Sequence, residues 1–164
     1  MSVYDPSDYD KSLCLKPSFG LYLTLIYGIK DFLLVILPAL ASFKSKSTSL
    51  DYLAGLVQPE MFVSDLIVIA LWMALFNRNT EAKKIWQKIW SKGRVLLIAA
   101  LGIQAIILLL EQLYLIVDVF NWQRALDVYL ISLFVINFIF LVNLFTSRRI
   151  KDVFLDWPQK KSAS

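Results

Sequence analysis

The sequence contains no histidine, a single cysteine and only five glycines among its 164 residues. Without histidine there is no Ser-His-Asp triad and no histidine metal site, and one cysteine excludes a cluster of thiolate ligands. A lone cysteine also forms no intramolecular disulfide, and the few glycines make no phosphate-binding loop. We therefore expect no cofactor, no metal and no enzymatic activity.

Charged residues are scarce too, at 18% of the chain, whereas 58% of the residues are apolar. This apolar share exceeds that of an ordinary soluble domain. Four windows approach or reach the roughly 20 residues with which a helix crosses a bilayer. They cover residues 19–40, 59–77, 95–117 and 126–145. The composition predicts an all-α membrane protein, a single domain built as a bundle of four transmembrane helices.

The orientation follows from residues 77–94, NRNTEAKKIWQKIWSKGR, which hold six of the seventeen Lys and Arg residues. Lys and Arg near helix ends stay in the cytoplasm during insertion. With this loop inside, residues 1–18 add two inner cations and the segment after residue 145 adds five, against three in the outer loops. We predict a multi-pass protein of the cell inner (plasma) membrane with both termini cytoplasmic. The first window is then an uncleaved anchor, because the acidic start MSVYDPSDYD lacks the basic region of a secretory signal.

The segment YDKSLCLKP precedes a first window that carries a basic residue near its middle. Together with four spans and a basic central loop, it resembles an uncharacterised bacterial inner-membrane family that includes the YfeZ-like proteins. The resemblance covers most of the chain, and YDKSLCLKP is its specific part. The family has no established activity, so the resemblance implies a fold and a location but no catalytic residues.

Charged and amide side chains occur inside the predicted spans. Lys30 lies near the bilayer centre, where a lysine costs roughly 2.5–3.5 kcal/mol. Neighbouring helix positions point about 100° apart, so Lys30 and Asp31 should pair poorly with each other and find partners on other spans. We predict a polar cluster that consists of Lys30, Asp31, Asp65, Gln104 and Glu111. In the alternative interpretation Asp65 and Glu111 lie at headgroup depth and Lys30 reaches water alone.

Small residues recur every four positions in the first window, a spacing that lets helix backbones approach closely. The helix should kink or end at Pro38, near its outer end. The predicted helix-packing residues are Gly20, Thr24, Gly28, Ala70, Ala74 and Asn137.

Two segments, at about residues 81–93 and 147–157, have an apolar helical face and a basic one. Such helices lie in the headgroup layer and attract anionic lipid at about 1 kcal/mol per basic residue. For the central loop, nucleic acid or an acidic partner is the alternative; lipid is favoured because the tryptophans need an interface in which to bury. The predicted lipid-interface residues are Lys83, Lys84, Trp86, Lys88, Trp90, Lys92, Arg148, Arg149 and Trp157.

Two classes of function fit these features. One is an accessory, scaffold or complex-assembly component that binds membrane lipids and either a partner subunit or further copies of itself, without nucleic acid. The other is a small oligomeric transporter or channel for an ion, proton or small solute, in which the charged residues of the first span take part. Four spans without an inverted repeat leave little room for an alternating-access site, which favours the first class.

Overall fold

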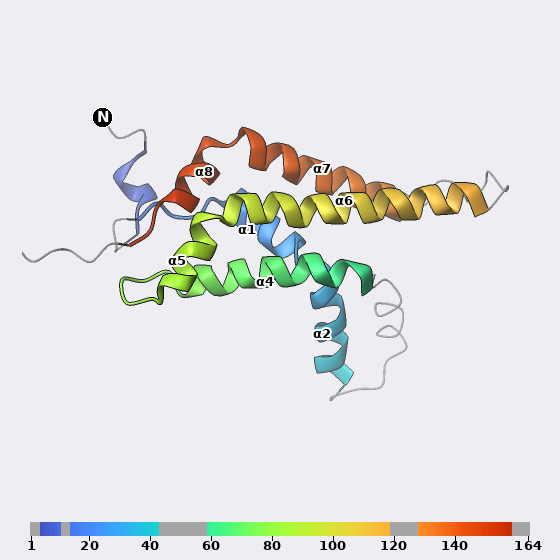
Figure 1. Ribbon diagram of the computed structural model, residues 1–164, viewed down its shortest axis with the longest axis horizontal. Coiled ribbons are helices and arrows are strands. Elements are labelled where there is room, and N and C mark those ends of the chain that lie inside the picture. Colours follow the sequence, from blue (N-terminus) through green and yellow to red (C-terminus); the bar gives the residue numbers. More distant parts are fainter. Residues whose placement is uncertain (1–3, 11–13, 43–58, 119–127, 159–164) are drawn as a thin grey trace, which may run out of the picture.

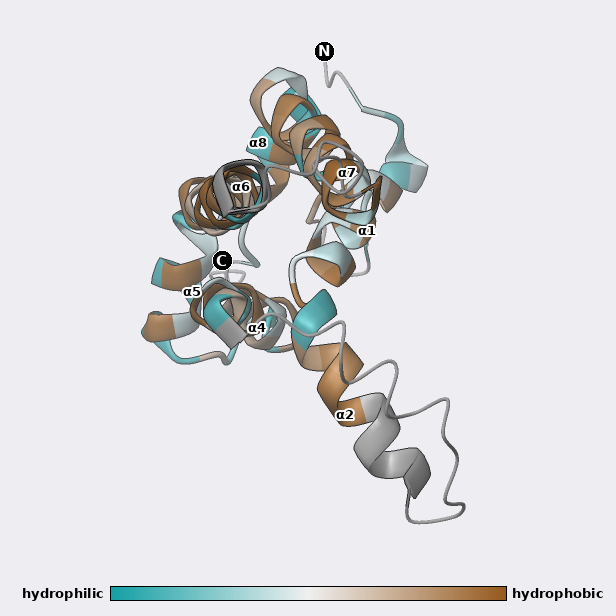
Figure 2. Cartoon of the chain, turned by 90° about the vertical axis from the view of Figure 1, so that its right-hand side faces the viewer, coloured by the Kyte–Doolittle hydropathy of each residue, from teal (hydrophilic) through white to brown (hydrophobic). Residues whose placement is uncertain are grey.

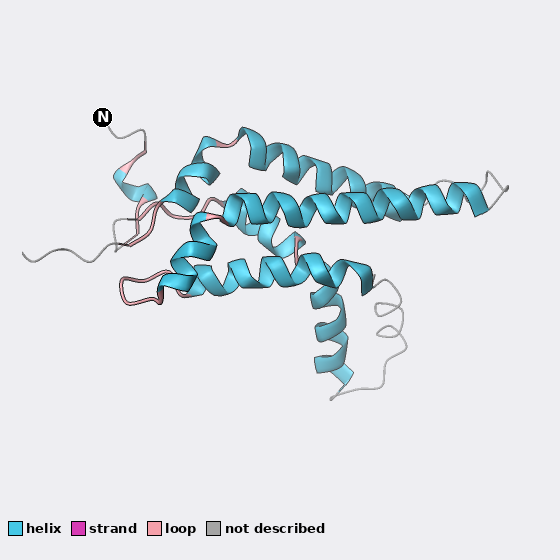
Figure 3. Cartoon of the chain, viewed as in Figure 1, coloured by secondary structure: helices cyan, strands magenta, loops and turns pink. Residues whose placement is uncertain are grey.

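The computed structural model describes residues 4–10, 14–42, 59–118 and 128–158. Within these ranges every regular element is a helix (Figure 3), so the all-α class is confirmed. Three long helices run side by side (Figure 1). They are α4 (Phe62–Phe76), α6 (Gly93–Asp118) and α7 (Val128–Thr146). A shorter helix, α1 (Phe19–Tyr27), completes the bundle between α7 and α4 (Figure 2).

Helices α6 and α7 form an antiparallel pair, as the short connection between them predicts. Leu97, Leu101 and Leu144 are buried in the apolar core of the bundle. At the beginning of α6, Arg94 donates from Nε to Leu144 O and from an Nη to Phe145 O, both at 3.0 Å. These carbonyls belong to the last turn of α7, where helix carbonyls lack intrahelical donors, so Arg94 ties the two helix ends together.

Two of the described helices are long and apolar enough to cross a membrane, Gly93–Leu113 and Val128–Thr146. A third span exists if α1 and α2 (Lys30–Ser42) count as one, because together they pass the same test. Helix α4 is apolar but short, and the 3₁₀ turn η2 (Pro59–Met61) precedes it, so helical structure begins at Pro59 as predicted. By length and composition the described part of the chain thus contains two or three candidate spans, and the four-span count stays a prediction.

The predicted first span is divided into two helices. Helix α2 is bent by 62° from α1, leaves the bundle and packs chiefly against α4 (Figures 1 and 2). The break lies at residues 28–29, and α2 continues past Pro38 to Ser42, so the helix does not end at Pro38, and the alternative of a kink there stays a prediction. The predicted outer loop, residues 41–58, lies almost entirely outside the described residues.

Two short helices and the amino-terminal segment lie together at one end of the bundle (Figure 1). Helix α5 (Lys84–Ser91) and helix α8 (Arg148–Leu155) form where the amphipathic segments are predicted. Residues 4–10 and 14–18 pack beside them, and the first of these stretches contains the 3₁₀ turn η1 (Pro6–Asp8). Both described chain ends therefore lie at the same end of the bundle. That this end faces the cytoplasm stays a prediction.

The apolar faces of α5 and α8 cover each other. The Trp90 ring is 1% exposed, and its centroid lies 4.8 Å from that of Phe154. Trp90 Nε1 donates to Val153 O at 2.9 Å. The assignment of Trp90 to the lipid interface is therefore wrong, because the protein itself supplies the apolar surface and the acceptor that this side chain needs.

Candidate functional site

The break between α1 and α2 is held by side chains from two other helices. In a continuous helix Phe32 N–H would donate to Gly28 O. Here Phe32 N donates to Asp65 Oδ2 at 2.8 Å, and Gly28 O accepts from Gln104 Nε2 at 3.3 Å. Asp65 on α4 and Gln104 on α6 thus replace both halves of the missing hydrogen bond. This matters because unpaired backbone groups are costly in an apolar environment.

A second carbonyl at the break is satisfied in the same way. Leu25 O would accept from Ile29 N–H in a continuous helix, but Ile29 N donates to Ile26 O at 3.3 Å instead. Leu25 O accepts from Trp72 Nε1 at 3.3 Å. Trp72 is thereby a second contact from α4 to the break.

The small-residue face of α1 lets its backbone approach helices α4 and α7 closely. A Cβ atom on Gly28 would lie 2.9 Å from Val68 Cγ2 on α4, and one on Gly20 would lie 3.1 Å from Asn143 Nδ2 on α7. Thr24, between them, is fully buried and its hydroxyl donates to Gly20 O at 2.8 Å. The face therefore contacts α7 at its beginning and α4 at the break.

The Gln104 amide is the centre of the buried network. Besides Gly28 O, its Nε2 lies 3.0 Å from Ser64 Oγ and 3.3 Å from Asp65 Oδ1, and these three acceptors share its two hydrogens. Its Oε1 accepts from Asn137 Nδ2 on α7 at 3.4 Å. Ser64, Asp65, Gln104 and Asn137 are all at most 1% exposed, so this network links three helices in the interior.

Lys30 and Asp31 form an ion pair, with Asp31 1% exposed. Lys30 Nζ also lies 3.2 Å from Met61 Sδ and 5.4 Å from the centroid of the Tyr27 ring. The expectation that these neighbours would not pair is wrong. Lys30 is the first residue of α2, so no turn of that helix precedes it. Its long, flexible side chain is therefore free to bend toward the Asp31 carboxylate.

The structure gathers the predicted polar cluster around the break. Lys30, Asp31, Asp65 and Gln104 meet there, and half-buried Glu111 lies within electrostatic range of Lys30 and Asp31. Sequence reasoning missed the partners Ser64 and Trp72. A signal for the break itself is present in the sequence, since Gly28 interrupts the apolar run two residues before the charged pair Lys30 and Asp31.

A second set of buried polar contacts joins the chain ends to the loop after α4. Arg78, whose side chain is 5% exposed, donates to Leu15 O at 2.9 Å and to Asp156 O at 3.0 Å. Leu15 N donates to Asp156 Oδ2 at 2.6 Å, and the Arg78 guanidinium lies 5.4 Å from the centre of the Trp90 ring. We call Leu15, Arg78, Trp90 and Asp156 the end clasp. No sequence pattern distinguishes Arg78 from the exposed cations that follow it.

Cys14 lies beside the end clasp and is 2% exposed. Burial raises the pKa of its thiol to about 11, and the negative charge of Asp156 contributes in the same direction. The thiol is therefore protonated and poorly reactive at neutral pH.

The remaining predicted residues differ in exposure. Ala74 is buried and Ala70 is half-buried in α4. Among the predicted lipid-interface residues, Trp86, Arg149 and Trp157 are half-buried. The exposed ones are Lys83, Lys84, Lys88, Lys92 and Arg148. Their contact with lipid stays a prediction.

In the part of the chain that the structure describes, no three His, Cys, Asp or Glu residues are grouped so as to hold a metal ion. No curated protein and no solved structure matches the chain. A family model described as a protein of unknown function matches residues 4–156, a range that contains every described helix and the whole end clasp. The chain belongs to this family, DUF2919.

Proposed function

We propose that this protein is a non-enzymatic accessory or scaffold component that assembles a membrane complex; its resemblance to the YfeZ-like proteins implies the location, the bacterial inner membrane. Both termini face the cytoplasm in this proposal, and four helices cross the membrane. The observation that carries it is the helix break, which holds α2 at 62° to α1 and away from the bundle.

Helix α2 offers an apolar surface to a partner. Its described side chains include Phe32 and Val35, which are 37% and 41% exposed. Helices associate in a membrane through close packing rather than through the hydrophobic effect, so a projecting helix gains contacts by packing on another helix. The proposed occupant is a helix of a different subunit, and the exposed lysines of α5, at the other end of α4, hold anionic lipid headgroups.

The first test is gentle extraction of the tagged protein, followed by the mass and subunit content of the native complex. A different subunit in fixed stoichiometry supports the proposal. A monomer or a pure homo-oligomer contradicts it.

A matched pair of variants locates the interface. Val35→Trp enlarges an exposed side chain on α2, whereas Val135→Trp enlarges one on α7 that is 50% exposed. We expect only Val35→Trp to reduce the yield of the partner, with both variants inserted and folded. Equal yields from the two variants would exclude α2 as the docking helix.

The second candidate is an oligomeric transporter or channel, and the same break favours it. Transporters bind ions and anionic groups at interrupted helices. Here the carboxylate of Asp65, on α4, accepts from the beginning of α2 next to the Lys30–Asp31 ion pair. Lys30→Met separates the two functions, with exposed Lys84→Met as its control. Loss of the complex favours assembly, whereas loss of flux in liposomes with the complex intact favours transport.

A further inference from the structure

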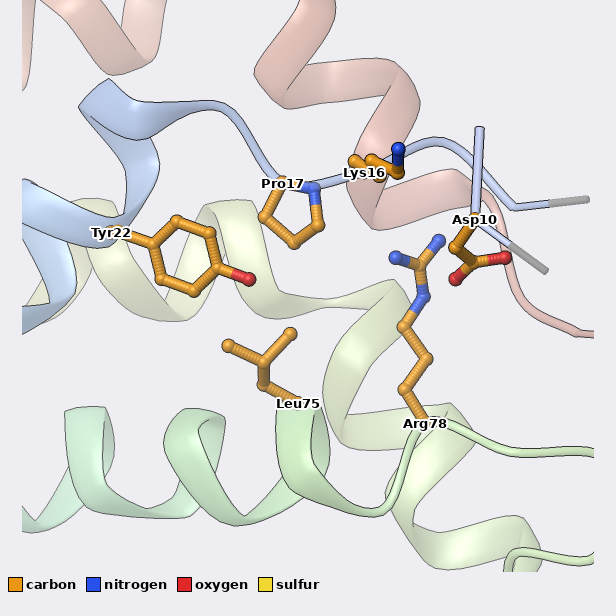
Figure 4. Close-up of a pocket in the computed structure, with 6 residues that line it drawn as sticks. All are labelled: Asp10, Lys16, Pro17, Tyr22, Leu75 and Arg78. Atoms are coloured by element: carbon orange, nitrogen blue, oxygen red, sulfur yellow. The ribbon is translucent and has the colours of Figure 1, made fainter. Parts of the chain in front are cut away.

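A pocket lies between the first turn of α1 and the last turn of α4, next to the end clasp (Figure 4). Its volume is about 310 Å³, and six residues line it: Asp10, Lys16, Pro17, Tyr22, Leu75 and Arg78. This is room for about ten water-sized groups, which suits a polar headgroup rather than a whole lipid or a large cofactor.

The lining has two cationic side chains and one carboxylate. Lys16 Nζ donates to Ser7 O at 2.9 Å and keeps two further N–H donors of the kind that bind phosphate. The Arg78 guanidinium is held in place by Leu15 O and Asp156 O, and it lies 3.9 Å from Asp156 Oδ2. Arg78 Nε is buried and has no hydrogen-bond partner among the described residues. The carboxylate is that of Asp10, which also accepts from Cys14 N at 3.0 Å.

The rest of the wall is apolar. Pro17, Leu75 and the Tyr22 ring form the side opposite the charged groups, with the Tyr22 hydroxyl directed toward the pocket (Figure 4). Tyr22 and Leu75 belong to apolar helices, whereas Asp10 and Lys16 belong to the polar segment before them. The pocket thus spans the change from apolar helix to polar chain, which is the depth at which a lipid headgroup meets its acyl chains.

We propose that this pocket binds the headgroup of a zwitterionic aminophospholipid, with a phosphodiester and a primary ammonium. Lys16 and Arg78 bind the phosphodiester, Asp10 binds the ammonium, and Leu75, Pro17 and the Tyr22 ring contact the glycerol and the first acyl carbons. The site is separate from the exposed cations of α5 and α8, and it does not depend on the proposed role in assembly.

The test uses the full-length chain, purified in detergent and freed of lipid. Native mass spectrometry and thermal unfolding measure the binding of phosphatidylethanolamine, phosphatidylcholine and phosphatidylglycerol with identical acyl chains. We expect one phosphatidylethanolamine per chain and weaker binding of phosphatidylcholine, whose trimethylated nitrogen donates no hydrogen bond to Asp10. Soluble glycerophosphoethanolamine tests whether the source is a lipid, and it should bind at least about tenfold more weakly because the apolar contacts are missing.

Two variants assign the binding to this pocket. Lys16 is exposed, so Lys16→Gln should fold and weaken phosphatidylethanolamine binding by about threefold to tenfold. Asp10→Asn keeps an oxygen acceptor for Cys14 N and should remove the preference for phosphatidylethanolamine over phosphatidylcholine. Lys84→Gln, on α5 outside the pocket, is the control: as a surface cation it should affect only the anionic phosphatidylglycerol, and it should leave phosphatidylethanolamine binding and its preference over phosphatidylcholine unchanged.

Three results would overturn the proposal. One is binding of all three lipids with equal affinity, and another is equal weakening by Lys16→Gln and Lys84→Gln, which marks a general surface attraction. The third is binding of glycerophosphoethanolamine as tight as that of the lipid, which makes the ligand a free phosphodiester. If Asp10→Asn does not fold, the Lys16→Gln and Lys84→Gln comparison decides alone.

Discussion

Replacement of Gly28 by alanine tests whether the break depends on close approach of α1 to α4. The added Cβ would lie 2.9 Å and 3.1 Å from the two methyl groups of Val68 and 3.3 Å from Thr24 O. Val68 is fully buried, so its methyl groups have little room to move. Overpacking costs about 1–3 kcal/mol, more than the roughly 0.5–1 kcal/mol that alanine gains over glycine in a helix. We expect Gly28→Ala to lower the free energy of unfolding by about 1–2 kcal/mol.

Denaturation in mixed micelles, followed by tryptophan fluorescence, measures this effect. Gly102→Ala is the control, because a Cβ there meets nothing within 4 Å and should stabilise α6 by about 0.5–1 kcal/mol. Val68→Ala supplies a double-mutant cycle. It removes the methyl groups that the new Cβ meets, so the double variant should be at least about 1 kcal/mol more stable than additivity predicts.

Two outcomes would refute this reasoning. If Gly28→Ala is as stable as Gly102→Ala, the backbones of α1 and α4 are not in close contact. If the effects of Gly28→Ala and Val68→Ala simply add, the cost of the alanine arises elsewhere.

Three further predictions concern the buried network and the end of the bundle. Gln104→Leu leaves Gly28 O without its donor and should destabilise the protein by about 1–3 kcal/mol in the same denaturation assay; an unchanged midpoint would show that the break does not need this amide. Gly93→Ala places a Cβ within 2.5 Å of Phe154 Cδ1, so α8 should detach and trypsin should cleave after its basic residues faster than in wild type; unchanged cleavage would contradict the tight contact. The raised pKa of the Cys14 thiol means that the folded state retains the proton, so this contribution to stability is present below pH 9 and is lost as pH rises toward about 11. Cys14→Ala should flatten the fall in melting temperature across that range, and identical pH profiles would contradict it.

Periodicity and length located the helices because those signals are local. The predicted third and fourth spans, residues 95–117 and 126–145, correspond closely to α6 and α7. Local patterns also gave the two amphipathic helices, but they did not reveal that α5 and α8 would cover each other's apolar faces. Which surface covers Trp90 depends on Val153 and Phe154, more than sixty residues away, so the period of the helix carries no information about it.

The break between α1 and α2 could not be predicted from local sequence patterns either, because it too depends on residues far away in the sequence. The acceptor and the donor that replace its missing hydrogen bond, Asp65 and Gln104, lie 33 and 76 residues from their backbone partners. An amide and a carboxylate in spans were recognised as members of one cluster, but their assignment to backbone groups required the position of the bend. Gly28 before Lys30 and Asp31 was the only local sign of it.

The energetics of the break favour a fixed bend over a moving gate. A straight helix would regain two backbone hydrogen bonds, from Phe32 N to Gly28 O and from Ile29 N to Leu25 O. It would also leave Asp65 Oδ2 and the half-buried Trp72 Nε1 without these backbone partners, at about 1–3 kcal/mol each and more for the charged one, while the Gln104 amide would keep Ser64 Oγ and Asp65 Oδ1 as acceptors. These penalties sum to several kcal/mol, comparable with the roughly 5.5 kcal/mol that a ligand must supply to reverse a two-state equilibrium from 1:99 to 99:1. A bend of this stability suits a protein that presents α2 to a partner, and a transporter built on it would need a ligand that itself satisfies Asp65 and Trp72.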